Sequence, residues 1–243
     1  LWNSPSSWKR IIPNIDKKIL IKVCLLSLKE SLLKFLNSNN LSINLNLIHD
    51  NSDEKFNDDL FKLLKNNKFK INFVESKVKG NHGSYLECCN NCEESEDLIF
   101  FIEDDYLFKE NAIEELLITY SRISTLLKEE IFLCPSDYPF YYDSIYNTSL
   151  FIGKNYRWRL VGETLLTFLF SKKLFDKHKN NICLVGEQLN DPFEKPLHDI
   201  FKKEKCLAPV TSTAYHLSRT VPGIESDWLE LWNKIYQKIN GGP

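Results

Sequence analysis

One stretch decides the fold, and it reads Leu98-Ile99-Phe100-Phe101-Ile102-Glu103-Asp104-Asp105-Tyr106. Its first half is apolar, β-branched or aromatic and shows no polar alternation, which predicts a short buried strand. Three carboxylates follow at once, so negative charge gathers at the end of a core strand. Such oxygen ligands suit Mg²⁺ or Mn²⁺, and open α/β sheets bind ligands at the carboxyl ends of their strands. The stretch therefore predicts a divalent-cation site; a solvated acidic turn is the simpler alternative.

Apolar runs and amphipathic segments alternate before this stretch and predict a parallel sheet flanked by helices. We expect strands at 19–28, 45–50 and 70–75, and helices at 29–36, 53–64, 85–94 and 112–127.

The chain changes character after residue 128, where shorter strands and more turns are expected. The predicted strands are 131–134, a hairpin of 150–152 with 156–161, and 210–216; the predicted helices are 172–177, 192–203 and 228–239. The fold class is therefore α/β, a mixed sheet flanked by helices with a β-rich second half, within a single domain over 1–243.

Composition limits the function classes. The chain has 243 residues with a net charge of −2, so no overall basic field indicates bulk nucleic-acid binding. Seven scattered cysteines form no disulfide framework, which predicts a reducing, cytoplasmic setting. No apolar run has the length of a membrane span. The chain begins at Leu1 and contains no methionine, so we expect the native start to lie upstream.

The acidic strand end resembles the metal motif of GT-A glycosyltransferases, a Rossmann-like family. Glu103-Asp104-Asp105 stands where that family carries Asp-x-Asp, with Glu replacing the usual first Asp. The resemblance implies that Glu103 and Asp105 lie at a Mn²⁺ or Mg²⁺ ion and Asp104 near the donor ribose. A cation bridging the two phosphates stabilises the charge that develops on the leaving nucleoside diphosphate.

The same resemblance assigns residues 19–128 to binding a nucleoside-diphosphate sugar, with a UDP-sugar favoured, and 129–243 to the acceptor and catalysis. Ser27 and Asp50, at the ends of the first two predicted strands, would line the nucleotide site. Asn81 and Gly83 resemble the family's Asn-x-Gly turn before a helix, whose N-terminus can face the diphosphate.

A late histidine, His216, ends the predicted strand at 210–216. By resemblance it is a third metal ligand; the alternative is a histidine with a backbone partner. The layout is also similar to that of a bacterial and phage set of family-two-like glycosyltransferases. The matching segments are Asp104–Tyr106, Asp137–Pro139, Trp158-Arg159 and Ala214–His216.

An inverting enzyme of this kind needs a carboxylate that deprotonates the acceptor hydroxyl. Asp191, at the start of the 192–203 helix, matches the family's placement, and Glu163 and Glu187 are rivals. Alternatively, Asp191 is only the N-cap of that helix.

Three other features carry weaker predictions. Arg157 and Arg159 could hold a phosphate or simply cover a solvated sheet face. Tyrosines in 138–146 could form a sugar platform or pack a core. The Cys88-Cys89-x-x-Cys92 cluster lacks the second cysteine pair that a zinc site requires.

Together these patterns predict a metal-dependent, inverting glycosyltransferase that transfers a sugar from a nucleoside-diphosphate sugar to an acceptor hydroxyl. The acceptor, whether glycan, lipid-linked, protein or modified DNA, is not resolved. One alternative is a nucleotidyltransferase of related fold, which would need a Gly-rich loop with Arg and Lys after the first strand. Another is a non-catalytic carbohydrate- or nucleic-acid-binding module.

Overall fold

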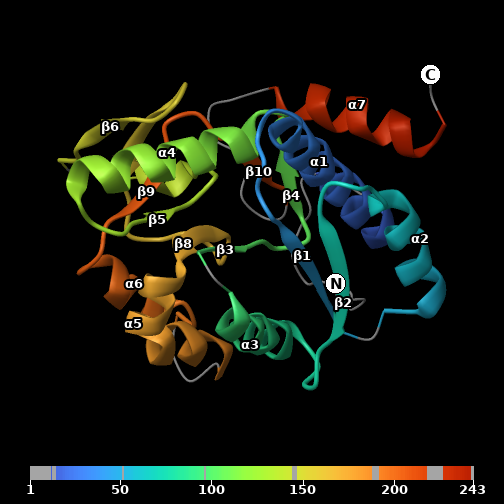
Figure 1. Ribbon diagram of the computed structural model, residues 1–243, viewed down its shortest axis with the longest axis horizontal. Coiled ribbons are helices and arrows are strands. Elements are labelled where there is room, and N and C mark those ends of the chain that lie inside the picture. Colours follow the sequence, from blue (N-terminus) through green and yellow to red (C-terminus); the bar gives the residue numbers. More distant parts are fainter. Residues whose placement is uncertain are drawn as a thin grey trace.

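A six-stranded mixed sheet forms the centre of the computed structural model, which describes residues 12, 15–50, 52–95, 97–143, 147–187, 192–217 and 227–241 (Figure 1). Strands β5 and β9 run parallel, and the other neighbouring pairs are antiparallel. The predicted mixed sheet flanked by helices is therefore confirmed. In order across the sheet the strands are β3 (Leu98–Phe101), β8 (Phe168–Ser171), β5 (Phe132–Leu133), β9 (Cys206–Pro209), β7 (Arg157–Leu160) and β6 (Leu150–Ile152).

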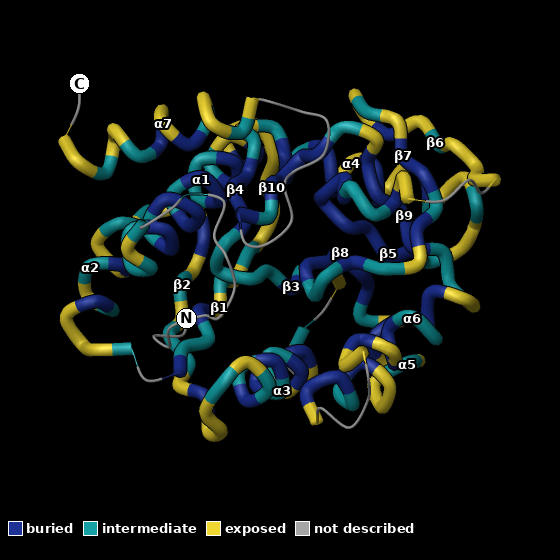
Figure 2. Tube along the Cα trace, turned by 180° about the vertical axis from the view of Figure 1, so that it is seen from behind, coloured by how far each residue is buried: buried dark blue, intermediate teal, exposed yellow. Residues whose placement is uncertain are grey.

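Helices cover both faces of this sheet (Figure 1). Along β8, Phe168 and Phe170 pack on one side and Leu169 on the other, as strand alternation requires. The inner strands β8, β5 and β9 are accordingly buried, whereas the edge strand β6 is largely exposed (Figure 2). Helix α4 (Ala112–Leu127) lies on one face, and α3 (Asn81–Asn91), α5 (Lys172–Leu184) and α6 (Lys195–Phe201) lie on the other.

The first predicted strand is wrong, because residues 19–28 belong to a single helix, α1 (Lys17–Ser38). Asp16 caps this helix by accepting from the N–H groups of Lys18 (2.7 Å) and Ile19 (3.3 Å). Helix α1 packs against helices and a strand on several sides, so its apolar residues are not confined to one stripe. A helix buried all round reads as a continuous apolar run, which is also the pattern of a buried strand.

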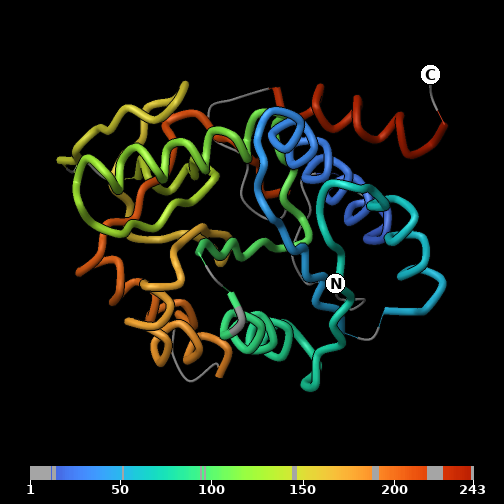
Figure 3. Tube along the Cα trace, viewed as in Figure 1, coloured from blue at the N-terminus to red at the C-terminus, as the bar shows by residue number. Residues whose placement is uncertain are grey.

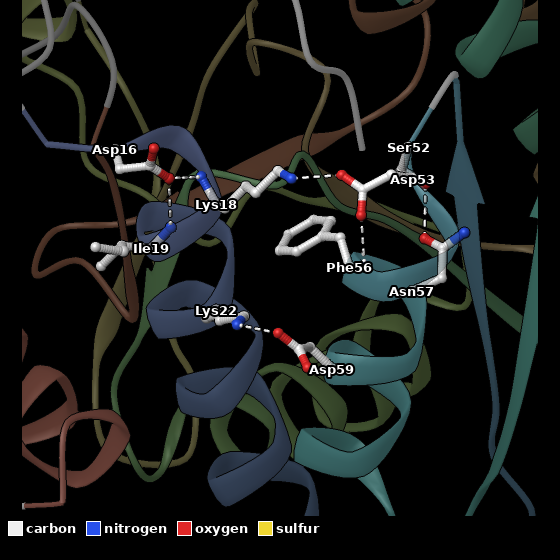
Figure 4. A network of polar contacts seen from close by, with 9 residues as sticks. All are labelled: Asp16, Lys18, Ile19, Lys22, Ser52, Asp53, Phe56, Asn57 and Asp59. Carbon is white, nitrogen blue, oxygen red and sulfur yellow. Dashed lines mark hydrogen bonds and ion pairs between the residues drawn. The ribbon is translucent and has the colours of Figure 1, made fainter.

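Strands β1 (Asn44–His49) and β2 (Lys70–Glu75) form a separate parallel pair, joined by α2 (Glu54–Leu64). Polar contacts tie α2 to α1 (Figure 4): Lys18 pairs with Asp53, and Lys22 Nζ lies 2.8 Å from Asp59. Asp53 also caps α2 through the N–H of Phe56 (2.8 Å). The predicted continuation of this sheet into residues 98–102 is not observed, because β3 pairs with β8 instead.

Two short strands connect distant parts of the chain. Strand β10 (Ala214–His216) pairs antiparallel with β4 (Tyr106–Phe108), so that His216 lies opposite Tyr106. The C-terminal helix α7 (Trp228–Ile239) packs beside α1, so the first and last helices of the described chain are neighbours (Figure 3).

Several element bounds differ from expectation. Helix α5 extends beyond the predicted 172–177, and β9 precedes the predicted strand at 210–216, of which only β10 forms. Short 3-10 turns lie at η1 (Cys92–Glu94), η2 (Pro139–Tyr142) and η3 (Val185–Glu187). Among the helices of the described residues, none combines the length and the apolar character that crossing a membrane requires.

Candidate metal and donor site

Three predicted ligands converge at the end of the acidic stretch. Glu103 and Asp105 lie in the turn between β3 and β4, and His216 ends β10. Candidate ligand atoms of these residues all lie within 4.8 Å of one another. The β4–β10 pairing thus brings a late histidine to carboxylates that sequence places far away.

Asp105 and His216 each have one buried polar atom without a partner. His216 Nε2 lies 3.3 Å from Asp105 Oδ2. The second carboxylate oxygen, Asp105 Oδ1, and the second ring nitrogen, His216 Nδ1, are buried without a hydrogen-bond partner in the described part of the chain. Buried polar atoms are normally satisfied, and two carboxylates with one imidazole suit a divalent cation. The residues present therefore fit the cation that the sequence predicts.

Aromatic, hydroxyl and backbone groups hold the candidate ligands in place. The Tyr106 ring stacks on His216 with centroids 4.6 Å apart, and its hydroxyl hydrogen-bonds the hydroxyl of Tyr138. The Glu103 N–H donates to Thr167 Oγ1 at 3.1 Å, and the Asp105 carbonyl accepts from Leu217 N–H at 2.8 Å. The cluster is thus anchored to both halves of the chain.

The three candidate ligands shift one another's pKa values. Burial, together with the nearby charge of Asp105, raises the pKa of Glu103 to about 8. Burial opposes charge on His216, but the Asp105 carboxylate outweighs this effect and raises the pKa of His216 to about 9. Burial also disfavours charge on Asp105, yet His216 keeps the pKa of Asp105 below its usual value. Asp105 is therefore the carboxylate that stays ionised.

A cavity of about 310 Å³ adjoins the cluster: Glu103 belongs to both, and Asp104 also lines the cavity. Strand β1 contributes residues 44–48 to its lining, and α3 contributes Asn81 and Ser84. Lys17, which also lines the cavity, places its Nζ 3.6 Å from Asp104 Oδ2. The volume is at the lower end of the range for small-molecule sites.

The predicted donor residues divide between this cavity and the core. Asn81 and Asp104 line the cavity. Ser27 does not, because it lies within α1, where its hydroxyl donates to the Cys24 carbonyl (2.6 Å) and accepts from the Phe108 N–H (2.9 Å). Its position follows from the helical conformation of the segment in which a strand was expected.

Asp50 and Gly83 do not line the cavity, and their contacts fix the backbone at the start of α3. Asp50 is buried and accepts a hydrogen bond from the Gly80 N–H, which ties the end of β1 to the start of α3. A Cβ at Gly83 would lie 1.7 Å from the Val78 carbonyl oxygen, so only glycine fits there without movement.

A second cluster contains one of the predicted bases. Candidate ligand atoms of Glu163, Glu194 and His198 also lie within 4.8 Å of one another. Burial and the charge of Glu163 raise the pKa of Glu194 to about 7. Glu187 lies exposed in η3 and is not in this group, and Asp191 lies outside the described residues.

The weaker sequence features are mainly structural. Arg159 is buried and pairs with Asp137, whereas Arg157 is exposed. Tyr138 and Tyr141 pack in the core, Tyr142 is exposed, and Tyr146 lies outside the described residues. Cys88, Cys89 and Cys92 belong to or pack against the main core cluster.

Sequence reasoning missed Glu194, His198 and Lys17. Glu194 and His198 are four residues apart, a spacing that places side chains on one helix face and could have signalled a joint role. Lys17 precedes an apolar run and carries no motif, so nothing in the sequence pointed to the cavity.

Comparison with known proteins finds a likeness at the level of fold. No protein-family model and no curated protein matches the chain. Among solved structures, apo UDP-glucose pyrophosphorylase is similar in fold, with a TM-score of 0.52 and 10% identity over 96% of this chain and 94% of that one. This likeness supports the α/β architecture.

Proposed function

We propose that this protein is a metal-dependent glycosyltransferase that moves a sugar from a nucleoside-diphosphate sugar to an acceptor hydroxyl with inversion. The observation that carries the proposal is the convergence of Glu103, Asp105 and His216, with two unsatisfied buried ligand atoms, beside a cavity. A cation held there would offset the charge of a leaving diphosphate. The fold likeness to a protein named for UDP-glucose agrees with a UDP-sugar donor.

Each residue then has a distinct role. Glu103, Asp105 and His216 would hold Mn²⁺ or Mg²⁺. Asp104, oriented by Lys17, would contact the donor ribose, and Asn81, which also lines the cavity, would bind the nucleotide. Ser27, Asp50 and Gly83 would act indirectly, by holding the elements around the cavity.

Asp191 is our candidate for the base that takes the acceptor proton, because it directly precedes the segment that carries Glu194 and α6. Glu163 is the second candidate, since it is half-buried beside Glu194. Exposed Glu187 is the third. A carboxylate in this role must lie within hydrogen-bond reach of the acceptor hydroxyl.

The test is calorimetric titration of UDP and other nucleoside diphosphates with and without Mn²⁺, followed by donor hydrolysis. We expect UDP to bind more tightly with Mn²⁺, and Asp105→Asn to abolish that gain. Asp176→Asn is the matched control, because Asp176 is an exposed α5 carboxylate paired with Lys172. If no diphosphate gains affinity from the metal, the proposal is wrong.

A nucleotidyltransferase is the second candidate, because the structural neighbour is named as a pyrophosphorylase. The loop after β1 begins Asp50-Asn51-Ser52-Asp53 and contains neither Gly nor Arg, which argues against it. Incubation with UTP and a sugar 1-phosphate separates the two functions: pyrophosphate release would favour this candidate over glycosyl transfer.

A further inference from the structure

We propose that Glu163, Glu194 and His198 form a second divalent-cation site, distinct from the site at Asp105 and selective for a transition ion such as Mn²⁺. The inference goes beyond the proposed glycosyl transfer and does not depend on it.

Local structure brings the three side chains together. Glu194 is the N-cap residue of α6, and the His198 N–H donates to its carbonyl at 3.2 Å, so the two residues are one helical turn apart on one face. Glu163 comes from the loop between β7 and β8, where the Tyr141 hydroxyl donates to its carbonyl. The ligand atoms of all three lie within 4.8 Å of one another.

One ligand atom of this cluster is buried without a partner: His198 Nε2 has no hydrogen-bond partner among the described residues. Glu194 is only 7% exposed, and burial together with the nearby charge of Glu163 acts on its carboxylate. Buried carboxylates and imidazoles are ordinarily satisfied, so these groups point to a ligand between them.

Other buried carboxylates of this protein have charged or hydrogen-bonding partners. Asp137 is paired with Arg159 and accepts from the Tyr142 hydroxyl at 2.6 Å. Glu115 accepts from the backbone N–H groups of Lys154 (3.0 Å) and Asn155 (2.8 Å). No described lysine or arginine pairs with Glu163 or Glu194, so a bound metal cation would supply the positive charge that Asp137 receives from Arg159.

The chemistry of the ligand set favours Mn²⁺ over Mg²⁺. An imidazole nitrogen suits transition ions, whereas Mg²⁺ prefers oxygen ligands and water. The charge of Glu194 also acts on Glu103 and His216, so both clusters belong to one acidic region. With Glu163 and Glu194 bound to an ion, Asp191 and Glu187 would remain as the candidate bases.

Counting bound ions tests the proposal. Wild-type protein dialysed against MnCl₂ is expected to hold two Mn²⁺ ions per chain. Glu194→Gln and His198→Gln should each hold one, and Asp105→Asn combined with Glu194→Gln should hold none. Asp199→Asn, an exposed carboxylate of α6 paired with Lys202, should keep both. Near-ultraviolet circular dichroism checks that each variant is folded.

Pulsed electron paramagnetic resonance gives a second readout, because it detects the coordinating imidazole nitrogen directly in the folded protein. Asp105→Asn protein loaded with one Mn²⁺ should show a nitrogen coupling, and adding His198→Gln should remove both the bound ion and this coupling. One ion in the wild type, two ions in Glu194→Gln or His198→Gln, or a nitrogen coupling that survives His198→Gln would each overturn the second site.

Discussion

The Tyr106 ring lies flat against the His216 imidazole, with ring planes only 9° apart and centroids 4.6 Å apart. This contact holds a candidate ligand from one side, while the Tyr106 hydroxyl reaches Tyr138. Tyr106→Phe keeps the stacked ring and leaves the buried Tyr138 hydroxyl without this partner. We expect a loss of about 1–3 kcal/mol in the free energy of unfolding, measured by urea denaturation, with Mn²⁺ affinity preserved.

Tyr106→Leu is the informative comparison, because it removes the ring that positions His216. Mn²⁺ affinity should then fall by about 10- to 100-fold, the range seen when a group that orients a ligand is removed. Equal Mn²⁺ affinity in Tyr106→Phe and Tyr106→Leu would mean that the stacking does not position the ligand.

Cation binding at the first site should depend steeply on pH. The pKa of Glu103 is raised to about 8 and that of His216 to about 9, so both groups carry protons at neutral pH. A bound cation must displace these protons, and its affinity therefore rises with pH up to these values and falls below them. Calorimetric titration of Mn²⁺ from about pH 6.5 to pH 8 should show at least about a tenfold gain per pH unit. A flat profile would contradict the ligand assignment.

The buried Asp137–Arg159 pair should stabilise the β-rich half only while both partners are present. Side chains of the pair are 6% and 9% exposed, respectively. Arg159→Leu leaves the Asp137 charge buried and should lower the free energy of unfolding by about 3–5 kcal/mol in guanidinium denaturation. Adding Asp137→Leu should recover much of that loss. Failure of the double variant to recover any stability would show that Arg159 acts through packing on the Tyr142 ring instead.

The hairpin between β6 and β7 has no room for a side chain at Gly153. A Cβ there would lie 2.3 Å from Trp158 Nε1 and 2.5 Å from Thr119 Oγ1. Gly153→Ala should therefore lower the melting temperature and cost about 1–3 kcal/mol of unfolding free energy. Gly162→Ala is the control, since a Cβ at Gly162 would meet nothing within 4 Å. Similar melting temperatures for both variants would contradict this packing argument.

Sequence periodicity correctly predicted the elements that bury one apolar face or one short apolar run. The predicted helices 112–127 and 228–239 match α4 and α7, and the predicted strand 70–75 matches β2. Each of these elements has one clear apolar face or a short β-branched run bounded by polar residues. Helix α1 lacked such a signal because neighbouring elements surround it, so its pattern could not distinguish helix from strand.

The residues of the candidate site could be predicted where carboxylates cluster in the sequence. They could not be predicted where pairing between distant strands brings them together. Glu103 and Asp105 stand out because carboxylates end an apolar run, and His216 stood out only through a family resemblance. The partner of β3 depends on pairing across the chain, which no local pattern encodes. Glu194 lies in a polar loop among other charged residues, so its burial became visible only in three dimensions.

The register of β10 on β4 links the assembly of the proposed metal site to the folding of the chain. His216 meets Tyr106 only when the late strand has docked, and a slip by one residue would present Tyr215 in its place. Closing so long a loop costs conformational entropy, which a cation bound between Asp105 and His216 would help to offset. The ion would thus act as a reversible cross-link that stabilises the fully folded protein relative to partly folded forms.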